Sequence, residues 1–311
     1  MKNAFLKGVF IGVFGLFSTS LLAQDDLMNM LDEEPQEEVV SKVYATFKGT
    51  HLVNANTIET VKAKTLDFRI IHRFGNIGVA SNGGGHTLWG LDAATNVRFS
   101  FDYGITDRLQ VGLGRSTTRE HLDFSVKYKI LEQTSDDKMP ITLDWYSNMA
   151  ITPMKDVNNY WDAVTDRMSF AHQIILARKF NKSFSFEILP TYFHRNWILQ
   201  NTNPDNNAQE TNDILALGLA GRIKITKRIA LIGEYFYDFS DYRTNNSLNP
   251  YYHPLGLGVE IETGGHVFHV NLSNASGIII NDFLPNSQDT WTKGGYKFGF
   301  AISRVFNAGR K

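Results

Sequence analysis

The sequence predicts an all-β protein, a transmembrane antiparallel up-and-down β-barrel of about 12 strands. Three observations lead to this fold class. Apolar residues alternate with polar or small residues over most of the chain after residue 64, which is typical of strands with two different faces. The connections between these strands are alternately short and long, as they are in outer-membrane barrels. A short apolar run near the N-terminus is typical of a secretory signal.

The first 23 residues have the anatomy of a cleaved signal peptide. Lys2 and Lys7 precede an apolar run over residues 8–17, and Ala23 supplies a small residue before the expected cleavage site. A membrane-anchoring helix is the alternative, but the run is shorter than the roughly 20 apolar residues that a spanning helix needs. Residues 1–23 are therefore expected to be removed on export.

Residues 24–63 are expected to form an acidic N-terminal segment on the periplasmic side. Residues 25–38 are rich in Asp and Glu and are interrupted by Pro35, which predicts a solvated stretch of chain. Residues 39–63 mix strand-like and polar residues. This pattern fits either a periplasmic appendage or a plug inside the barrel, and the sequence leaves both alternatives open.

The strands are recognised by their period of two. In the clearest example, Phe99 and Phe101 point to one side of an extended chain, while Arg98 and Asp102 point to the other. The expected strands have their apolar positions within residues 66–74, 97–105, 109–113, 122–130, 141–145, 170–176, 184–192, 215–223, 229–237, 255–261, 268–272 and 296–302. The barrel is therefore expected over residues 64–307, followed by a tail at residues 308–311.

The lengths of the connections support a membrane barrel. Short breaks are expected at residues 106–108, 134–138, 181–182, 226–228 and 263–265, and long connections at residues 75–95, 152–166, 196–212, 240–253 and 274–295. Residues 116–120 form a connection of intermediate length. In an outer-membrane barrel the short turns lie in the periplasm and the long loops outside, so an even number of strands returns the chain to the periplasm.

A soluble β-sandwich is the main alternative to this fold. Its apolar face would point inward and carry mainly aliphatic side chains, with a polar outer face. Here the second face of the strands holds Gly, Ala, Ser and charges of both signs, and aromatic residues make up 13% of the chain. These features favour a barrel whose aromatic-rich face meets lipid.

Composition excludes several classes of function. A net charge of -1 argues against nucleic acid as the main partner. The absence of cysteine excludes disulfides, thiolate metal sites and cysteine nucleophiles. No cofactor is expected, and the lipid of the bacterial outer membrane is the expected surrounding of the barrel.

Four stretches carry a resemblance to a known family. They are TFKGTHLVNANTIETV at 46–61, GLDAATNVRFSFDYGITDRLQVGLG at 90–114, TGGHVFHVNLSNASG at 263–277 and GFAISRVF at 299–306. Together they resemble a Bacteroidota family of outer-membrane β-barrels, a domain of unknown function. The resemblance covers nearly all of the chain after the signal peptide. It implies the fold and an outer-membrane location, and it transfers no activity to individual residues.

If the apolar face meets lipid, the other face lines the lumen. The candidate lumen-lining residues are Arg69, Arg98, Asp102, Lys127, Asp144, Glu187, Arg222, Glu234, Glu260 and His269. One interpretation is a self-neutralising network that fills a narrow barrel, because charges withdrawn from water must be paired. The other is a constriction that selects polar solutes. The network is favoured, because about 12 strands lie between filled small barrels and open porins.

Two patterns raise the question of chemistry. His269, Asn271 and Ser273 are residue types of a hydrolytic triad on one strand face, but neighbours on one face lie roughly 7 Å apart, beyond hydrogen-bond reach. Six further histidines fall at strand ends or in connections at the long-loop side: His72, His86, His121, His172, His194 and His253. Their spacing is not that of a metal site. An enzyme and a metal centre are therefore not expected.

Two functions remain from the sequence. The first is a channel for small polar solutes, in which the lumen charges set the selectivity. The second is a filled barrel that acts as an anchoring or interaction platform, with a periplasmic partner on the N-terminal segment. An outer-membrane hydrolase is a distant third.

Overall fold

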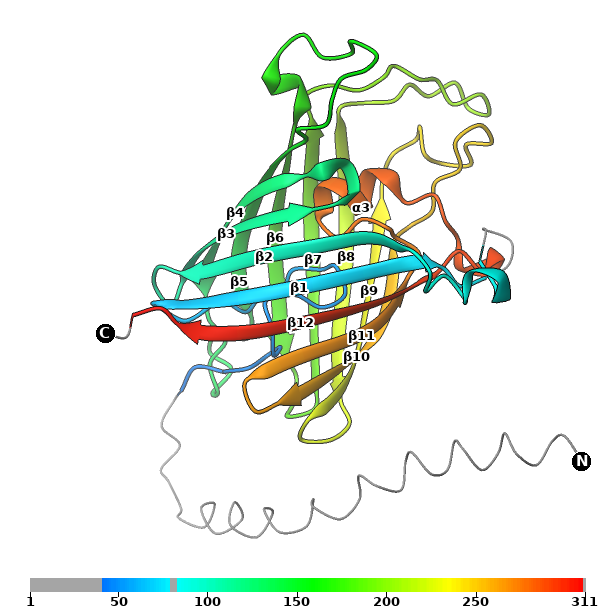
Figure 1. Cartoon of the computed structure of the whole chain (residues 1–311). Coiled ribbons are helices and arrows are strands. Elements are labelled where there is room, and N and C mark those ends of the chain that lie inside the picture. The colour runs from blue at the N-terminus through cyan, green and yellow to red at the C-terminus, as the bar shows by residue number, and fades with distance from the viewer. Residues whose placement is uncertain (1–40, 79–82, 310–311) are drawn as a thin grey trace, which may run out of the picture. The chain divides into compact units, whose positions relative to one another are not determined.

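The computed structural model describes residues 41–78 and 83–309. The predicted signal peptide and the acidic stretch up to residue 40 lie outside these residues. In the described part, twelve strands form one closed barrel in which each strand is antiparallel to its neighbours in sequence (Figure 1). The first and last strands close the circle, with Arg69 opposite Ser303. The predicted fold class, an up-and-down barrel, is confirmed.

The strands are mostly longer than their apolar positions alone indicated. They are β1 (Thr65–Asn76), β2 (Ala94–Gly104), β3 (Leu109–Ser116), β4 (Leu122–Leu131), β5 (Thr142–Ile151), β6 (Met168–Lys179), β7 (Phe184–Arg195), β8 (Asp213–Lys224), β9 (Ile229–Asp238), β10 (Leu255–Thr263), β11 (His266–Ser273) and β12 (Lys297–Asn307). The helical elements are short: η2 (Gly85–Thr87), η3 (Thr118–Glu120), η4 (Val164–Arg167), α3 (Ile280–Asn286) and η5 (Trp291–Lys293).

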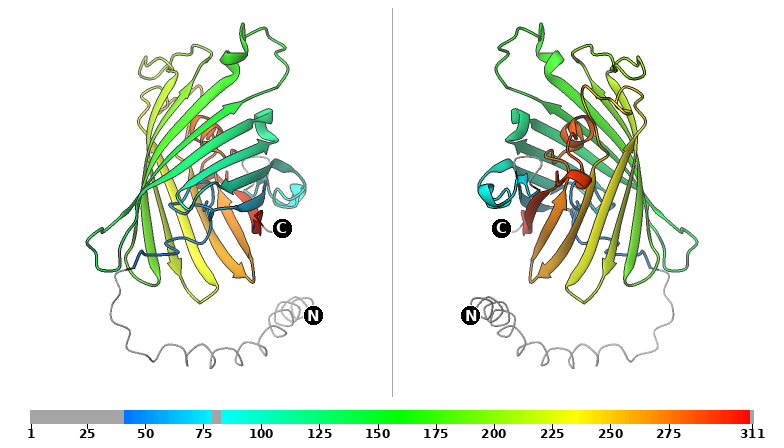
Figure 2. Two further views of the ribbon diagram at one scale, coloured as in Figure 1. Left: turned by 90° about the vertical axis from the view of Figure 1, so that its left-hand side faces the viewer. Right: turned by 90° about the vertical axis from the view of Figure 1, so that its right-hand side faces the viewer.

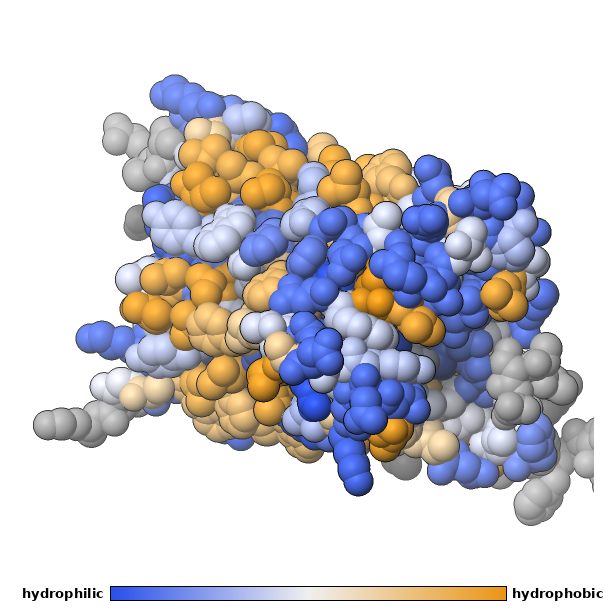
Figure 3. All heavy atoms as spheres, turned by 90° about the horizontal axis from the view of Figure 1, so that it is seen from above, coloured by the Kyte–Doolittle hydropathy of each residue, from blue (hydrophilic) through white to orange (hydrophobic). Residues whose placement is uncertain are grey.

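The two faces of the strands have the predicted environments. On β2, Phe99 and Phe101 are 43% and 46% exposed on the outer wall, whereas Arg98 and Asp102 are 7% and 4% exposed inside. The pleat of a strand sends successive side chains to opposite faces, so this alternation follows from the sequence. Large apolar side chains such as Leu215 are exposed all around the wall. Seen from above, hydrophobic residues form bands along the flanks, and hydrophilic residues gather over the long connections (Figure 3).

The two rims of the barrel differ. At one rim, here called the short-turn rim, tight turns join β2 to β3, β6 to β7, β8 to β9 and β10 to β11. Residues 65 and 307, where β1 begins and β12 ends, lie opposite each other at this rim. The opposite, long-loop rim carries the connections of residues 152–167, 196–212 and 239–254, which extend beyond the strands (Figure 2), and the connection of residues 274–296, which turns into the barrel.

The interior is less polar than the alternation of residues along the strands predicts. Several large apolar residues also face inward. Among them are Ile175, Leu189, Phe193 and Phe236, each of which is 0% exposed. They form one apolar cluster with residues of the N-terminal segment and of α3. The helix α3, drawn in orange in Figures 1 and 2, was not predicted and lies within the circle of strands at the long-loop end. In the described part of the chain, no helix has both the length and the apolar character needed to cross a membrane.

Candidate functional site: the filled lumen and the long-loop mouth

Residues 42–64, here called the inner segment, enter the barrel, and residues 46–58 lie mostly buried inside it (blue in Figure 1). Phe47, Leu52 and Ile58 are only 1–2% exposed, and they pack in the apolar cluster with the wall. Apart from isolated bridges, such as Ala63 with Gly104, the inner segment forms no regular secondary structure. A few of its backbone groups bond within the segment, such as the N–H of Leu52 with the carbonyl of Ala55, and the others must find partners on the barrel wall.

Glu234 on β9 binds the middle of the inner segment. Its carboxylate accepts hydrogen bonds from the backbone N–H groups of Val53 at 3.1 Å, Asn54 at 2.8 Å and Ala55 at 2.8 Å. Three successive N–H groups that point to one side make a concave anion-binding site, or nest. The buried carboxylate is thus held by the dipoles of the inner segment.

Lys127 on β4 and Glu187 on β7 bind the next part of the inner segment, at residues 57–59. The Lys127 ammonium donates to the carbonyl oxygens of Thr57 at 3.0 Å and Glu59 at 3.1 Å. The Glu187 carboxylate accepts from the backbone N–H of Ile58 at 3.2 Å. A cation meets carbonyls and an anion meets N–H groups, so the wall and the segment are complementary in charge.

Thr50 connects the inner segment to β1 and β2. Arg69 donates to the Thr50 hydroxyl at 2.6 Å, and that hydroxyl donates to the Asp102 carboxylate at 3.4 Å. Arg69 also pairs with Asp67 at 3.1 Å. These contacts fix the segment on the side of the barrel where β1 meets β2.

Two further ion pairs lie in the wall itself. Arg98 reaches across β3 to Asp123 on β4 and binds both carboxylate oxygens. Gly114 makes this reach possible, because a Cβ there would lie 2.2 Å from the Arg98 guanidinium. Elsewhere, Glu260 accepts from Arg222 at 2.7 Å and lies 3.3 Å from His269.

The residues predicted to line the lumen are all buried on the inner face. Their exposed fractions are 2% for Arg69, 7% for Arg98, 4% for Asp102, 1% for Lys127, 0% for Asp144, 0% for Glu187, 7% for Arg222, 4% for Glu234, 1% for Glu260 and 4% for His269. Half of them bind the inner segment rather than a free lumen. Within the described residues, the carboxylate of Asp144 has no hydrogen-bond partner. Arg73, which the same period of two also turns toward the lumen, donates to the Asn54 side chain at 2.8 Å. Asp123 follows this period as well and was not singled out.

The residue patterns considered above for a hydrolytic triad and for a metal site do not form such sites in the described part of the chain. His269 pairs with Glu260, and the Ser273 hydroxyl accepts from the backbone N–H of Ala275 at 3.1 Å, so neither is directed at the other. Among residues 41–78 and 83–309, no three His, Cys, Asp or Glu side chains come together in a way that could hold a metal ion.

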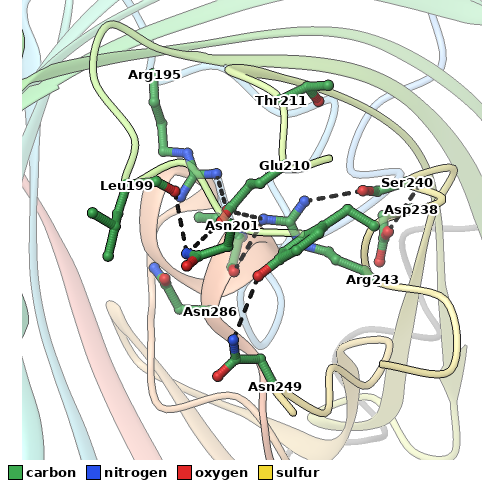
Figure 4. Close-up of polar contacts among 12 residues, drawn as sticks. Arg195, Leu199, Asn201, Glu210, Thr211, Asp238, Ser240, Arg243, Asn249 and Asn286 are labelled. Atoms are coloured by element: carbon green, nitrogen blue, oxygen red, sulfur yellow. Dashed lines mark hydrogen bonds and ion pairs between the residues drawn. The ribbon is translucent and has the colours of Figure 1, made fainter. Parts of the chain in front are cut away.

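The long-loop mouth is held together by charged contacts between loops. Glu210 lies between Arg195 at 2.8 Å and Arg243 at 3.6 Å (Figure 4). Arg243 also donates to the Ser240 hydroxyl at 3.3 Å and stacks its guanidinium on Tyr251 at 4.9 Å. The connections β7–β8 and β9–β10 are thereby fixed to each other.

The helix α3 is seated in this mouth by polar and apolar contacts. Asn281 donates to Ser169 at 3.0 Å, and Arg119 donates to Asn286 at 2.8 Å. On its inner side, the ring of Phe283 meets Phe236 edge to face at 4.9 Å. Gly277 lets the chain pass closely under α3, since a Cβ there would lie 2.5 Å from a backbone nitrogen.

Two titratable groups at the mouth have unusual acidity. Burial raises the pKa of Asp282 on α3 to about 6, against a smaller opposite effect of Arg119. Burial, with Arg119 nearby, lowers the pKa of His121 to about 4. Both groups lie in connections where no strand period applies, so the alternation that placed the wall residues could not place either of them.

A closed barrel with an apolar outer wall and charges buried inside is a membrane β-barrel. The chain belongs to the family described as the membrane-bound β-barrel domain (DUF5777), which matches residues 47–306. The family resemblance read from the sequence is confirmed in this respect. No curated protein sequence matches the chain.

Solved structures that resemble the chain are outer-membrane barrels of low sequence identity. The NanC porin is 11% identical with a TM-score of 0.44, covering 77% of this chain and 98% of the porin. The COG4313 outer membrane channel from Pseudomonas putida F1 is 12% identical with a TM-score of 0.44, covering 80% of this chain and 98% of the channel. The OmpF porin of Salmonella typhi is 10% identical with a TM-score of 0.32, covering 76% and 74%.

Proposed function

We propose that this protein is an outer-membrane β-barrel that is filled at rest and acts as an anchoring and interaction platform. The observation that carries the proposal is the inner segment, whose backbone is bound by Glu234, Glu187 and Lys127. In an open channel these charges would face water and passing solutes. Here they bind the chain's own backbone.

The packing of the lumen supports the same role. Ile58 of the inner segment and Phe283 of α3 belong to one apolar cluster, so the lumen is occupied from both ends. A cavity of about 10 Å³ remains beside His51 and Arg98. That volume suits about one water molecule, so this part of the lumen, between the inner segment and the chain that leads into α3, is too narrow for a solute.

The proposed orientation follows the usual asymmetry of outer-membrane barrels. Short turns face the periplasm and long connections face outward. The outer wall would then contact lipid, and the mouth around Glu210 would be displayed outside. The chain before residue 42 would extend into the periplasm, where its acidic residues are available to a partner.

The test is conductance in planar bilayers. Purified full-length protein is expected to insert without discrete current steps, with heat-modifiable migration as the control for folding. Steps of regular size from the unaltered protein would overturn a lumen filled at rest.

A cross-linked variant sharpens this test. A Cβ at Gly256 would lie 3.0 Å from the Cβ of Val53, and the chain contains no other cysteine. Val53→Cys with Gly256→Cys therefore brings two Cβ atoms within the roughly 3.8 Å that separates them in a disulfide, so a bond can form once the segment shifts slightly outward. If the unaltered protein does conduct, oxidation that stops the current assigns the path to displacement of the inner segment.

A gated channel for small polar solutes is the second candidate. The observation in its favour is that the inner segment contributes no strand to the barrel, so it can leave without breaking the wall. Deleting residues 42–63 separates the candidates. A folded, silent deletion variant supports the platform alone, whereas regular current steps, with an ion selectivity altered by Arg98→Gln and Arg222→Gln, support the channel.

A further inference from the structure

A cavity of about 460 Å³ opens at the long-loop mouth. Its floor is α3, and its walls come from the β3–β4 connection, the start of β6 and the chain that follows β7. The volume falls within the range of roughly 300–1,000 Å³ that is usual for small-molecule sites. Ligand size and access are therefore compatible with binding from the long-loop side.

Four polar atoms of the lining have no hydrogen-bond partner among the described residues. They are His121 Nδ1, Arg195 Nε, Asn281 Oδ1 and Asp282 Oδ2. His121, Asn281 and Asp282 are only 7%, 3% and 2% exposed. An unsatisfied buried polar atom costs about 1–3 kcal/mol, so four of them in one cavity require an explanation.

The side chains that carry these atoms are held in place at their other ends. Asn281 donates through its amide nitrogen to Ser169 at 3.0 Å, and the other oxygen of Asp282 lies 3.7 Å from Arg119. Arg195 donates through its terminal nitrogen to Glu210 at 2.8 Å (Figure 4). The side chains that carry the unpartnered atoms are thus fixed parts of the cavity lining, as the polar groups of a preformed binding site are.

Aromatic side chains line the cavity as well. Trp161 and Trp197 meet edge to face with their ring centres 6.4 Å apart, and both line the cavity. The Arg167 guanidinium covers one face of Trp161 at 4.7 Å. Indole rings supply flat apolar surface for the C–H face of a ligand.

The charges of the lining are balanced. Three arginines and three carboxylates line the cavity: Arg119, Arg167, Arg195, Asp166, Glu210 and Asp282. A strongly anionic or cationic ligand would meet both attraction and repulsion here. A neutral ligand with many hydroxyl groups can donate to the oxygens of Asn281 and Asp282 and accept from Arg195.

We propose that this cavity binds a neutral saccharide. The sugar's hydroxyl groups would satisfy the four unpartnered atoms, and its C–H face would pack on the indoles of Trp161 or Trp197. His121 fits either role, since its neutral ring can donate or accept at Nδ1. This proposal does not depend on whether the barrel conducts.

The test uses labelled full-length protein in detergent on an array of immobilised neutral and acidic oligosaccharides. Binding to a subset of the neutral oligosaccharides is expected. Asp282→Asn should weaken that binding at least about tenfold, because it replaces a charged acceptor. Trp197→Ala should weaken it to a similar extent through lost packing. Trp89→Ala, at an exposed site in the β1–β2 connection outside the cavity lining, is the matched control and should bind like the unaltered protein.

Two results would overturn the proposal. One is an absence of binding to every neutral oligosaccharide by protein whose heat-modifiable migration shows a folded barrel, including the case in which only acidic oligosaccharides bind. The other is full binding by both Asp282→Asn and Trp197→Ala. If Asp282→Asn fails to fold, Trp197→Ala alone decides, because its side chain is partly exposed and no buried polar group is lost.

Discussion

Both carboxylate oxygens of Glu234 accept hydrogen bonds from the backbone N–H of Asn54, at 2.9 and 2.8 Å. The two residues are 180 positions apart in sequence. One belongs to β9 in the wall and the other to the inner segment. This contact, with those of the neighbouring N–H groups, is therefore the point at which the filling of the barrel can be tested with a single substitution.

Glu234→Gln should loosen the inner segment. The substitution removes the negative charge that three N–H groups share and turns an amide NH₂ toward donors. We expect a loss of about 2–4 kcal/mol in the free energy of unfolding, together with faster trypsin cleavage at Lys48 and Lys62. Limited proteolysis and the temperature of heat-modifiable migration measure the two effects.

Glu262→Gln is the matched control for that experiment. Glu262 also pairs with the inner segment, through Lys48 at 2.9 Å, but both side chains are partly exposed. Surface ion pairs contribute about 0–1 kcal/mol. Equal effects of the two substitutions would contradict a special role of the Glu234 contact.

Gly277→Ala should displace α3 from its packed position in the mouth. The new Cβ would lie 2.5 Å from the backbone nitrogen of Phe283, and backbone cannot move aside as a flexible side chain can. We expect about 1–3 kcal/mol of destabilisation, the usual range for overpacking. Gly264→Ala, where a Cβ meets nothing within 4 Å, should leave the melting temperature unchanged. A similar fall in both variants would mean that the close approach at Gly277 is not the cause.

Asp282 and His121 should give opposite dependences of stability on pH. The pKa of Asp282 is about 6 in the folded chain and ordinarily 3.8, so its stabilising contribution is full below pH 3.8 and is lost as pH rises through 6. The pKa of His121 is about 4 and ordinarily 6.5, so its contribution is full above pH 6.5 and is lost as pH falls through 4. Each effect is on the order of 3 kcal/mol.

Single variants separate these two contributions. Between pH 4 and 6 the unaltered protein should change little in melting temperature, because the two contributions oppose each other. Asp282→Asn should become more stable as pH rises, and His121→Gln less stable. Thermal unfolding followed by tryptophan fluorescence across this pH range checks both slopes, and parallel slopes in the two variants would contradict the assignment.

The barrel was predictable because a strand has one simple period. The alternation of Phe99 and Arg98 determines which side chain meets lipid and which is buried, and no distant contact is needed to read it. The position of the inner segment was not predictable, because its residues follow no regular period. Its position is set by contacts such as Lys127 with Thr57, between residues far apart in sequence.

The mouth was unpredictable for a related reason. His121 and Asp282 lie in two separate connections, Arg195 ends β7, and each is an ordinary polar residue in its local sequence. Only the closure of the barrel brings these parts of the chain together. The sequence predicts the strands to which they attach, but no local pattern predicts that their side chains line one cavity.

The pair of Arg98 and Asp123 allows the buried charges of the wall to be tested apart from the inner segment. Arg98 binds both oxygens of Asp123, and the two side chains are 8% and 2% exposed. Removing one member of a buried pair leaves the other charge without compensation, which costs about 3–5 kcal/mol. Removing both members leaves no such charge.

Arg98→Met should therefore destabilise the barrel by about 3–5 kcal/mol, and Arg98→Met with Asp123→Leu should recover most of that loss. Urea unfolding of the two single variants and the double variant in detergent gives the coupling free energy directly. Trypsin cleavage of the inner segment should stay slow in the double variant, since neither residue makes a hydrogen bond to it. Additive losses in the cycle would mean that the two charges act independently and that the wall is not a self-neutralising network at this point.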